Sequence, residues 1–260
     1  MIAKLPKYAL WLALALLVWF AVAVFGPKFG MVDWRFALGT MLREVGPILI
    51  GITALVALVA LWKGPRGEWW KAALALAIPA ALMAGLASVA SKAQSVPPIH
   101  DVATDTANPP TFSAATMAIR EMAEANPIND YSVPLGEMDA WMGLPDDSPV
   151  KGQSHAQIIA EAFPDLQPIA FTTDRADAMA SVSAAMSDIG LTDIRSDVEA
   201  GTVEGTAETF AFGFKDDVVA RVGDGVIDLR SVSRVGLSDL GYNAARLREL
   251  SAAIEARLGE

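Results

Sequence analysis

The sequence predicts a membrane-anchored α+β protein: three transmembrane helices, then a soluble domain in which helices pack on an antiparallel sheet. The first observation is that three charge-free apolar runs fill about residues 8–25, 47–62 and 72–90. Each run is close to the ~17–25 residues that a helix needs to cross a hydrocarbon core about 30 Å thick. The second observation is that short apolar segments alternate with turn residues after residue 93. We therefore expect an anchor over residues 1–93 and a soluble domain over residues 94–260.

Charge divides the chain at the same place. Residues 1–94 contain nine Lys/Arg and three Asp/Glu, whereas residues 95–260 contain eleven and twenty-seven, a net charge of −16. Such an acidic domain does not bind nucleic acid or an anionic membrane surface through its overall field, and basic partners or divalent cations suit it better. The simpler interpretation is that the acidity serves solubility. The chain has no cysteine, which excludes a disulfide, a thiolate nucleophile and a Cys-ligated metal.

Positive charges beside the spans predict the orientation of the anchor. The side of the N-terminus has six positive groups, which are the α-amine, Lys4, Lys7, Lys63, Arg66 and Lys71. The opposite side has four, which are Lys28, Arg35, Arg43 and Lys92. The difference predicts a multi-pass protein of the bacterial inner membrane with a cytoplasmic N-terminus and a periplasmic C-terminal domain. A signal peptide cleaved after residues 21–23 is the competing interpretation, but the length of the first run and the two runs that follow favour a span.

The predicted spans contain no Asp, Glu, Lys, Arg or His, so the sequence does not indicate an ion or proton path through them. The third span has small residues that would allow close helix packing: Ala80, Ala84, Gly85, Ala87 and Ser88. Residues 26–46 form an interfacial loop whose apolar residues recur at helical spacing. Two interpretations of this loop stay open, an amphipathic helix in the membrane interface or a connection packed on the spans.

Two segments of the domain precede its expected core. A linker is expected at residues 91–98, and nearby prolines predict extended chain through residue 106. His100, beside Asp101 and Asp105, fits a hydrogen-bonding clip that fixes this segment better than a metal ligand.

Residues 126–152, rich in Pro, Gly, Asp and Asn, predict a long surface loop. Its large side chains either bind a partner or pin the loop to the core, and these are Tyr131, Met138, Trp141 and Met142.

The remaining patterns predict alternating helices and strands, with a compact core over about residues 166–260. Helices are expected at residues 114–125, 154–163, 174–189 and 240–258. Strands are expected at residues 192–197, 202–209, 210–214, 218–222 and 226–234. Turns are expected at residues 200–201, 215–217 and 223–225.

One string near the C-terminus is highly specific. Residues 230–243 read R-S-V-S-R-V-G-L-S-D-L-G-Y-N, and residues 213–219 read G-F-K-D-D-V-V. With residues 97–105, residues 163–168 and the loop after the first span, they resemble the bacterial and plastid family called domain of unknown function 1499, in its members with N-terminal spans. The resemblance touches nearly the whole chain, but the family has no established reaction, so it implies no mechanism and no cofactor.

The same string contains the candidate ligand-binding residues, which are Arg230, Arg234, Ser231, Ser233, Asp239, Asn243, Asp216 and Asp217. Period-two alternation puts the two arginines on one strand face, where they can hold carboxylates bidentately. The three aspartates are expected partners, and Ser238, Asp239 or Asn243 can cap the final helix. Three interpretations stay open: a structural latch between strand and helix, a pocket for a phosphate or carboxylate, and a catalytic site.

Catalysis has the weakest support. The only histidines are His100 and His155, and the chain has no G-x-S-x-G, H-E-x-x-H or P-loop motif. We expect no catalytic residue, no metal and no cofactor. The expected function is a non-enzymatic binding or accessory module, anchored in the lipid bilayer, for an envelope partner or membrane complex. The alternatives are a small-anion or lipid-headgroup site at the arginine cluster and, with less support, a carboxylate-dependent hydrolase. The sequence does not specify the oligomeric state.

Overall fold

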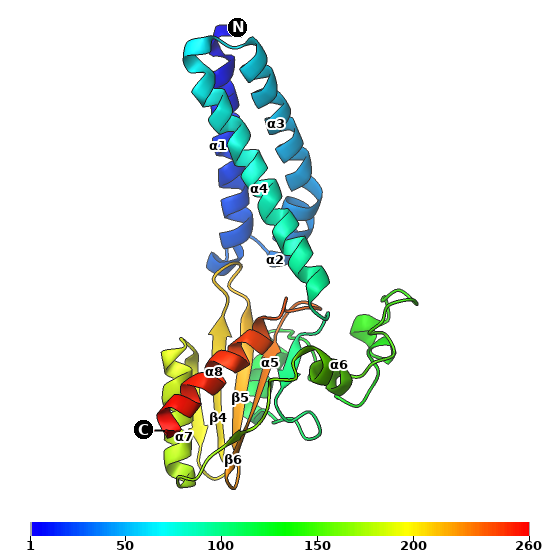
Figure 1. Cartoon of the computed structure of the whole chain (residues 1–260), viewed down its shortest axis with the longest axis vertical. Helices are drawn as coiled ribbons and strands as arrows, with labels where there is room; N and C mark the ends of the chain where they lie inside the picture. The colour runs from blue at the N-terminus through cyan, green and yellow to red at the C-terminus, as the bar shows by residue number, and fades with distance from the viewer. Residues whose placement is uncertain (1, 260) are drawn as a thin grey trace. The chain divides into compact units, whose positions relative to one another are not determined.

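The structure is a computed structural model that describes residues 2–259, and the chain forms two compact units (Figure 1). The first unit contains the chain up to Lys92 together with Thr209–Gly213. The second unit contains Ala93–Glu208 and the chain from Phe214 onward.

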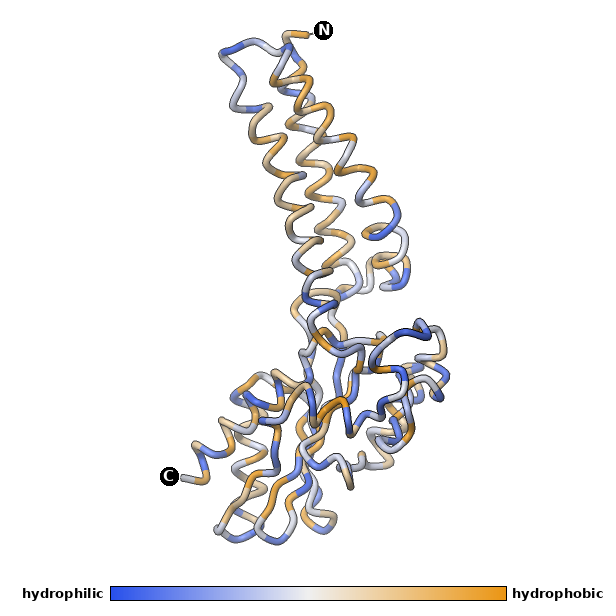
Figure 2. Tube along the Cα trace, turned by 45° about the vertical axis from the view of Figure 1, so that its right-hand side comes forward, coloured by the Kyte–Doolittle hydropathy of each residue, from blue (hydrophilic) through white to orange (hydrophobic). Residues whose placement is uncertain are grey.

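Three long apolar helices make up most of the first unit: α1 (Leu5–Phe25), α3 (Gly46–Lys63) and α4 (Trp69–Ser95). They are long and apolar enough to cross a membrane, and Figure 2 shows the hydrophobic residues that follow one another along them. Small residues let the helices approach closely, because Ala9, Ala13, Ala57, Ala60, Ala72 and Ala75 form their common core. The small residues from Ala80 to Ser88, in contrast, are exposed.

Helix α4 is longer than the sequence predicted. It continues to Ser95, so the linker expected from residue 91 is wrong over its first five residues. Ser91 to Gln94 contain no helix breaker, and the first residue that cannot continue a helix is Pro97.

The loop after α1 is a helical connection. Asp33 caps the short helix α2 (Trp34–Phe36) by accepting hydrogen bonds from the backbone N–H groups of Arg35 and Phe36, at 2.9 and 3.1 Å. A π-helical segment, Ala37–Val45, then runs directly into α3. The indole Nε1 of Trp19 donates to the Met41 carbonyl at 3.2 Å, and Met41 is buried. These contacts favour a connection packed on the helices.

The second unit is built on one antiparallel sheet. Its strands are β1 (Asp101–Ala103), β2 (Ile169–Ala170), β3 (Thr192–Asp197), β4 (Thr202–Glu208), β5 (Lys215–Val222) and β6 (Val226–Ser233). The strand order is β1-β6-β5-β4-β3, and β2 pairs with the other end of β6. The prediction of an antiparallel sheet packed by helices is therefore confirmed.

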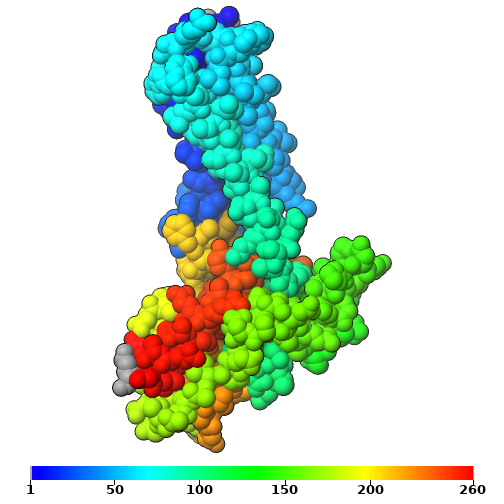
Figure 3. All heavy atoms as spheres, in the orientation of Figure 1, coloured from blue at the N-terminus to red at the C-terminus, as the bar shows by residue number. Residues whose placement is uncertain are grey.

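The second unit has the helices α5 (Ala114–Met122), α6 (His155–Ala162), α7 (Arg175–Asp188) and α8 (Tyr242–Leu258), and α6 lies to the side of the sheet. Helices α7 and α8 lie together on one face, and α5 lies behind the sheet in Figure 1. In the space-filling view α8 appears in red, and the green segment that includes residues 126–152 stands out beside it (Figure 3). The predicted helices are confirmed within a few residues, and their caps include Asp174 for α7 and a Ser154–Gln157 capping box for α6.

Two predictions between β4 and β5 are wrong. Strand β5 begins at Lys215, so the predicted turn at residues 215–217 is strand, and the predicted strand at residues 210–214 is mostly the hairpin connection. The chain reverses where Phe212 and Gly213 adopt φ of 65° and 67°, a left-handed conformation that ends a strand. Asp216 and Asp217 looked like turn residues because the arginines that pair with them inside the sheet come from other segments of the chain.

One apolar core holds the second unit together, and it extends well before residue 166. Ile99, Val102, Leu135 and Trp141 belong to the same cluster as Val182 and Leu247. Tyr131 and Trp141 are buried at 4% and 1% exposure, and Met138 packs against the same core. The large side chains of residues 126–152 therefore mostly pin this segment to the core, while Met142 stays exposed.

Candidate functional site

The two faces of the sheet differ in chemistry. Residues opposite each other in the register share a face, so Val218 with Ser231 and Ala220 with Leu229 face α7 and α8. On the other face, Asp217 lies opposite Val232 and Val219 lies opposite Arg230. This second face, which we call the charged face, also contains Asp101, Glu204 and Thr206 by the registers of β1 and β4.

Arg230 is held by Asp101 at the centre of the charged face. Its Nε and Nη2 donate to the two carboxylate oxygens of Asp101 at 2.9 and 2.7 Å, a bidentate pair buried at 2% and 0% exposure. Nη1 donates to the Pro110 carbonyl at 3.1 Å, and Nη2 also lies 3.3 Å from the Asn129 carbonyl. Every nitrogen of this guanidinium group therefore has a partner within the domain.

Tyr131 completes this group. Its hydroxyl donates to Asp101 Oδ1 at 2.6 Å, and the guanidinium of Arg230 lies 5.0 Å from the centroid of its ring. Burial and the charge of Asp101 raise the pKa of Tyr131 well above its ordinary value, so the hydroxyl keeps its proton. Burial opposes the charge of Arg230, but the hydrogen bonds and charge of Asp101 outweigh burial, and the pKa of Arg230 is raised.

Asp217 holds two arginines on the same face. Arg234 donates through Nη2 to Oδ1 at 2.6 Å and through Nε to Oδ2 at 3.0 Å. Arg120, from α5, donates through Nη1 to Oδ2 at 2.6 Å and through Nη2 to the Asn126 carbonyl at 2.8 Å. The Nε of Arg120 is buried without a hydrogen-bond partner among the described residues. These bonds fasten α5 and the chain that follows it to the sheet.

Asn129 joins the two histidines. Its Nδ2 lies 3.4 Å from His100 Nε2 and 3.2 Å from His155 Nε2, and the His100 ring stacks on Trp141 with centroids 5.1 Å apart. His100 Nδ1 lies 3.3 Å from the Leu237 carbonyl, which fits a donor at that nitrogen. An amide NH₂ group has two hydrogens, so it satisfies both Nε2 atoms only when both rings are neutral and protonated at Nδ1.

The pKa shifts of the two histidines agree with this arrangement. Burial lowers the pKa of His100, although Asp101 acts in the opposite direction, and burial lowers the pKa of His155 to about 4. His100 thus links the extended segment that contains it to the loop before α8 through the Leu237 carbonyl. This is the hydrogen-bonding clip that the sequence predicted.

The residues of the C-terminal string that face α8 form a separate network. Ser231 Oγ donates to Asn243 Oδ1 at 2.7 Å, and Asn243 Nδ2 donates to Ser233 Oγ at 3.0 Å and to the His100 carbonyl at 2.9 Å. Arg246 donates to Ser231 Oγ and to Asp216 Oδ2, at 3.0 and 2.6 Å. Among the described residues, Ser231 Oγ contacts Asn243 and Arg246 and Ser233 Oγ contacts Asn243, and neither contact is with a carboxylate or an imidazole.

Asp239 shapes the start of α8. Its carboxylate accepts from the backbone N–H groups of Gly241 and Asn243, each at 2.7 Å. Gly236 and Gly241 adopt φ of 91° and 79°, so the tight passage that leads into the helix needs glycine at both positions. Burial raises the pKa of Asp239 to about 6 despite these two hydrogen bonds.

The predicted site residues thus lie in two networks on opposite sides of the sheet. Arg230, Arg234 and Asp217 lie on the charged face, where each arginine has its own carboxylate. Asp216, Ser231, Ser233, Asn243 and Asp239 lie toward α8.

The sequence did not predict that Asp101 pairs with Arg230. It also did not predict that four other residues belong to these networks, which are Arg120, Asn129, Tyr131 and Arg246. Asp101 lies within residues 97–105, which carry part of the family resemblance, and Arg246 lies three residues after the C-terminal string, so both had a usable signal. Arg120, Asn129 and Tyr131 had none, because only the fold brings α5 and the following loop to the sheet.

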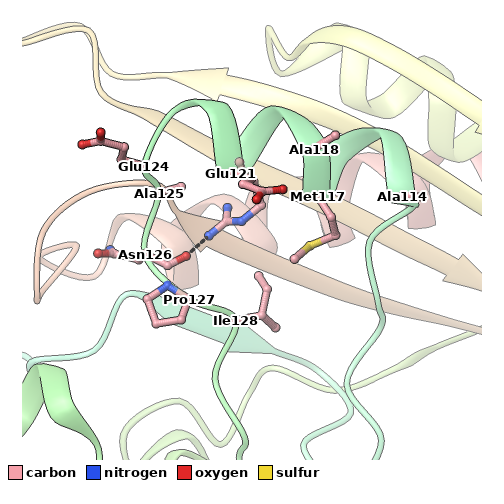
Figure 4. A pocket seen from close by; sticks show the side chains of 10 residues that line it. Ala114, Met117, Ala118, Glu121, Glu124, Ala125, Asn126, Pro127 and Ile128 are labelled. Carbon is pink, nitrogen blue, oxygen red and sulfur yellow. Dashed lines mark hydrogen bonds between the residues drawn. The ribbon is translucent and has the colours of Figure 1, made fainter.

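A hollow of about 590 Å³ lies beside α5 (Figure 4). Its apolar lining includes Met117, Ala118, Pro127 and Ile128, and Glu121 and Glu124 contribute carboxylates. Arg120 also lines the hollow, and its Nη2 donates to the Asn126 carbonyl, the hydrogen bond that the dashed line in Figure 4 marks. Met117 is 40% exposed, so a large apolar side chain is accessible here.

Within residues 2–259, no group of three or more His, Asp and Glu side chains lies close enough to hold a metal ion. The geometry thus offers two internal networks whose polar groups mostly bind one another, and an open hollow beside α5 with an apolar lining and acidic residues.

The comparisons with known proteins agree with the resemblance in the C-terminal string. Neither the search of curated proteins nor the search of solved structures finds a significant match. A family described as "Protein of unknown function (DUF1499)" matches residues 101–254, which is more than half of the chain. The chain therefore belongs to the DUF1499 family.

Proposed function

We propose that this protein is a non-enzymatic binding module, anchored in a bacterial inner membrane, whose periplasmic domain docks a basic segment of an envelope partner or membrane complex. The docking surface is the hollow beside α5. The observation that carries this proposal is the combination there of an exposed apolar lining with the carboxylates of Glu121 and Glu124. A segment with one large apolar side chain next to Lys or Arg complements both parts of this surface.

The distribution of charge supports a basic partner. At least nine of the eleven Lys and Arg residues after residue 94 form ion pairs within the domain. The carboxylates are far more numerous, so most of them have no cation to neutralise them. The surface potential is therefore negative, which attracts basic partners and speeds their association.

The size of the hollow indicates a modest contact. A space of about 590 Å³ accommodates a few side chains, so the isolated interaction is expected to be weak. Confinement of both partners to the same membrane raises their effective concentration, so a weak contact is sufficient for assembly.

The alternative site at Arg230 and Arg234 has less support. A phosphate or lipid headgroup would have to displace Asp101 from Arg230 or Asp217 from Arg234, and these ion pairs are buried. Leaving a buried carboxylate without its partner is unfavourable by several kcal/mol, about 3–5. A structural latch is the role that these contacts favour for the two arginines.

Photo-crosslinking in cells tests the proposed function. A photoreactive amino acid replaces Met117 on α5 or, as the matched control, Asp177 on α7, and crosslinked proteins are identified by mass spectrometry. We expect residue 117 to capture a specific envelope protein through a basic segment, and we expect the Glu121→Lys/Glu124→Lys variant to lose that crosslink. The Asp177→Lys/Glu249→Lys variant makes the same change of charge on α7 and α8 and should keep it. Equal capture at residues 117 and 177, or a crosslink that survives both pairs of substitutions, would overturn the proposal.

A further inference from the structure

The connection between β4 and β5 has an unusual composition. Residues 208–214 read E-T-F-A-F-G-F, so three phenylalanines and no charge lie between Glu208 and Lys215. Phe210 is 80% exposed. A soluble hairpin normally has polar residues at its tip, and a large exposed apolar side chain usually marks a surface that contacts another molecule or a membrane.

The tip belongs to the compact unit of the apolar helices. Thr209–Gly213 lie in the first unit, and the Phe210 ring meets the Phe25 ring edge-on with centroids 5.4 Å apart. Within this unit the Phe212 backbone N–H donates to the Val24 carbonyl at 2.9 Å. Gly213 is required for this approach, since a Cβ there would lie 2.9 Å from the Lys28 Cα and φ is 67°.

The position of Phe25 decides which partner the tip fits. Phe25 is the last residue of α1, so in a membrane-spanning α1 it lies at the level where the hydrocarbon core meets the headgroups. Aromatic side chains are favoured at this level, and an uncharged tip avoids the cost of placing a charge there.

We propose that the β4–β5 tip, residues 209–213, inserts into the lipid interface beside the C-terminal end of α1, with Phe210 as the side chain in contact with lipid. The tip is thus a second attachment of the domain to the bilayer, in addition to its covalent connection through α4. This attachment is separate from the hollow beside α5 and does not depend on the function proposed for it.

Site-directed spin labelling tests this proposal directly, because the chain has no native cysteine. Single variants Phe210→Cys and Ala211→Cys of the full-length protein are labelled with a nitroxide and reconstituted into phosphatidylcholine and phosphatidylglycerol vesicles. Val18→Cys, at a 62% exposed position on α1, is the lipid reference, and Val198→Cys, at a 70% exposed turn position, is the water reference. Collision rates with oxygen and with an aqueous nickel chelate give the depth of each label.

We expect the ratio of oxygen to nickel collisions at residues 210 and 211 to exceed that at residue 198 severalfold and to stay below that at residue 18, which lies about 10 Å deeper in the span. Phe210→Asp should lower the ratio at residue 211 to the value for water. A water-like label at both tip positions, or a label shielded from both reagents, would overturn the proposal. A ratio that changes with the protein-to-lipid proportion would indicate contact with a second copy and would also overturn it.

Discussion

The two faces of the sheet are stabilised by different chemistry although the same strands build both. Toward α7 and α8, Val218, Ala220 and Leu229 belong to the apolar core. Toward α5, Val219 and Val232 are equally buried but lie outside that core, among Asp217, Arg230 and Asp101. Apolar packing is tolerant of small shifts, whereas ion pairs with two hydrogen bonds fix distance and direction.

This difference follows from what covers each face. Helices α7 and α8 are long and regular, so an apolar stripe is sufficient to bind them. The charged face is covered by the short helix α5 and by irregular chain around Asn129, which offer little apolar area. Buried ion pairs add little net stability relative to apolar packing, but they fix α5 and the chain around Asn129 in a single position on the sheet.

The largest effect is expected on the charged face. Asp101→Ala leaves the Arg230 guanidinium buried without its carboxylate, and we expect the free energy of unfolding to fall by about 3–5 kcal/mol. Pulse proteolysis of the full-length protein in detergent at increasing urea measures this change. The double variant Asp101→Ala/Arg230→Met should recover part of the loss, and a double variant as unstable as the sum of the singles would contradict the assigned pairing.

The apolar face should respond by a different route. Leu247→Ala opens a cavity between α8 and the sheet, and we expect a loss of about 2–4 kcal/mol. Hydrogen exchange distinguishes the two variants, because Asp101→Ala should increase exchange mainly in residues 99–131, while Leu247→Ala should weaken protection throughout the sheet. Identical exchange patterns would mean that the two faces are one cooperative unit.

The pH dependence should reveal two opposite contributions. Unfolded His155 takes up a proton near its ordinary pKa of 6.5 but the folded residue does so only at about 4, so its stabilising contribution is complete above pH 6.5 and is lost as the pH falls. Asp239 has a raised pKa of about 6 in the folded domain against 3.8, so its contribution is complete at low pH and is lost as the pH rises through 6.

The two slopes oppose each other between about pH 4 and 6. Asp239→Asn should therefore lose stability on acidification more steeply than the wild type, and His155→Gln less steeply, each by up to about 2–3 kcal/mol over this range. Urea unfolding at several pH values measures both slopes. Parallel curves for all three proteins would show that neither group changes its pKa on folding.

The smallest effect is expected at the surface. Arg248 and Asp165 form an ion pair with side chains 42% and 54% exposed, so Arg248→Ala should change the free energy of unfolding by less than about 1 kcal/mol. The same urea experiment at low and high salt checks it. A loss as large as that of Asp101→Ala would mean that exposure does not explain why the charged face is sensitive.

Much of the fold could be predicted because its signals are local. Apolar runs and their length located α1, α3 and α4, and alternating residues with caps located α7, α8 and most strands. The hairpin tip was misplaced because Phe210, Phe212 and Phe214 have strong strand preference, and only the left-handed backbone at Phe212 shows that the chain turns. At this point the tertiary structure overrides the strand preference of the three phenylalanines.

The candidate site was predicted only in part. The string around residues 230–243 identified the arginines, but Asp101 is more than a hundred residues away and its pairing depends on the register of β1 with β6. The two histidines appeared isolated from any motif, yet Asn129 brings them together. Such long-range partners have no spacing rule within one sequence, so they become visible only when the fold is known.

The alternation along β5 has one more consequence. Asp216 and Asp217 are neighbours in the chain, but one pairs with Arg246 and the other with Arg120 and Arg234 on opposite sides of the sheet. A slip of β5 by one residue in one direction would put Val218 in the place of Asp217, beside Arg120 and Arg234, and would push Arg221 into the apolar core. A slip in the other direction would put Lys215 beside Arg246 and Asp217 in the apolar place of Val218. The residue order of β5 therefore specifies its register. An insertion or deletion in this strand should destabilise the domain far more than a substitution, because it moves every following side chain to the opposite face.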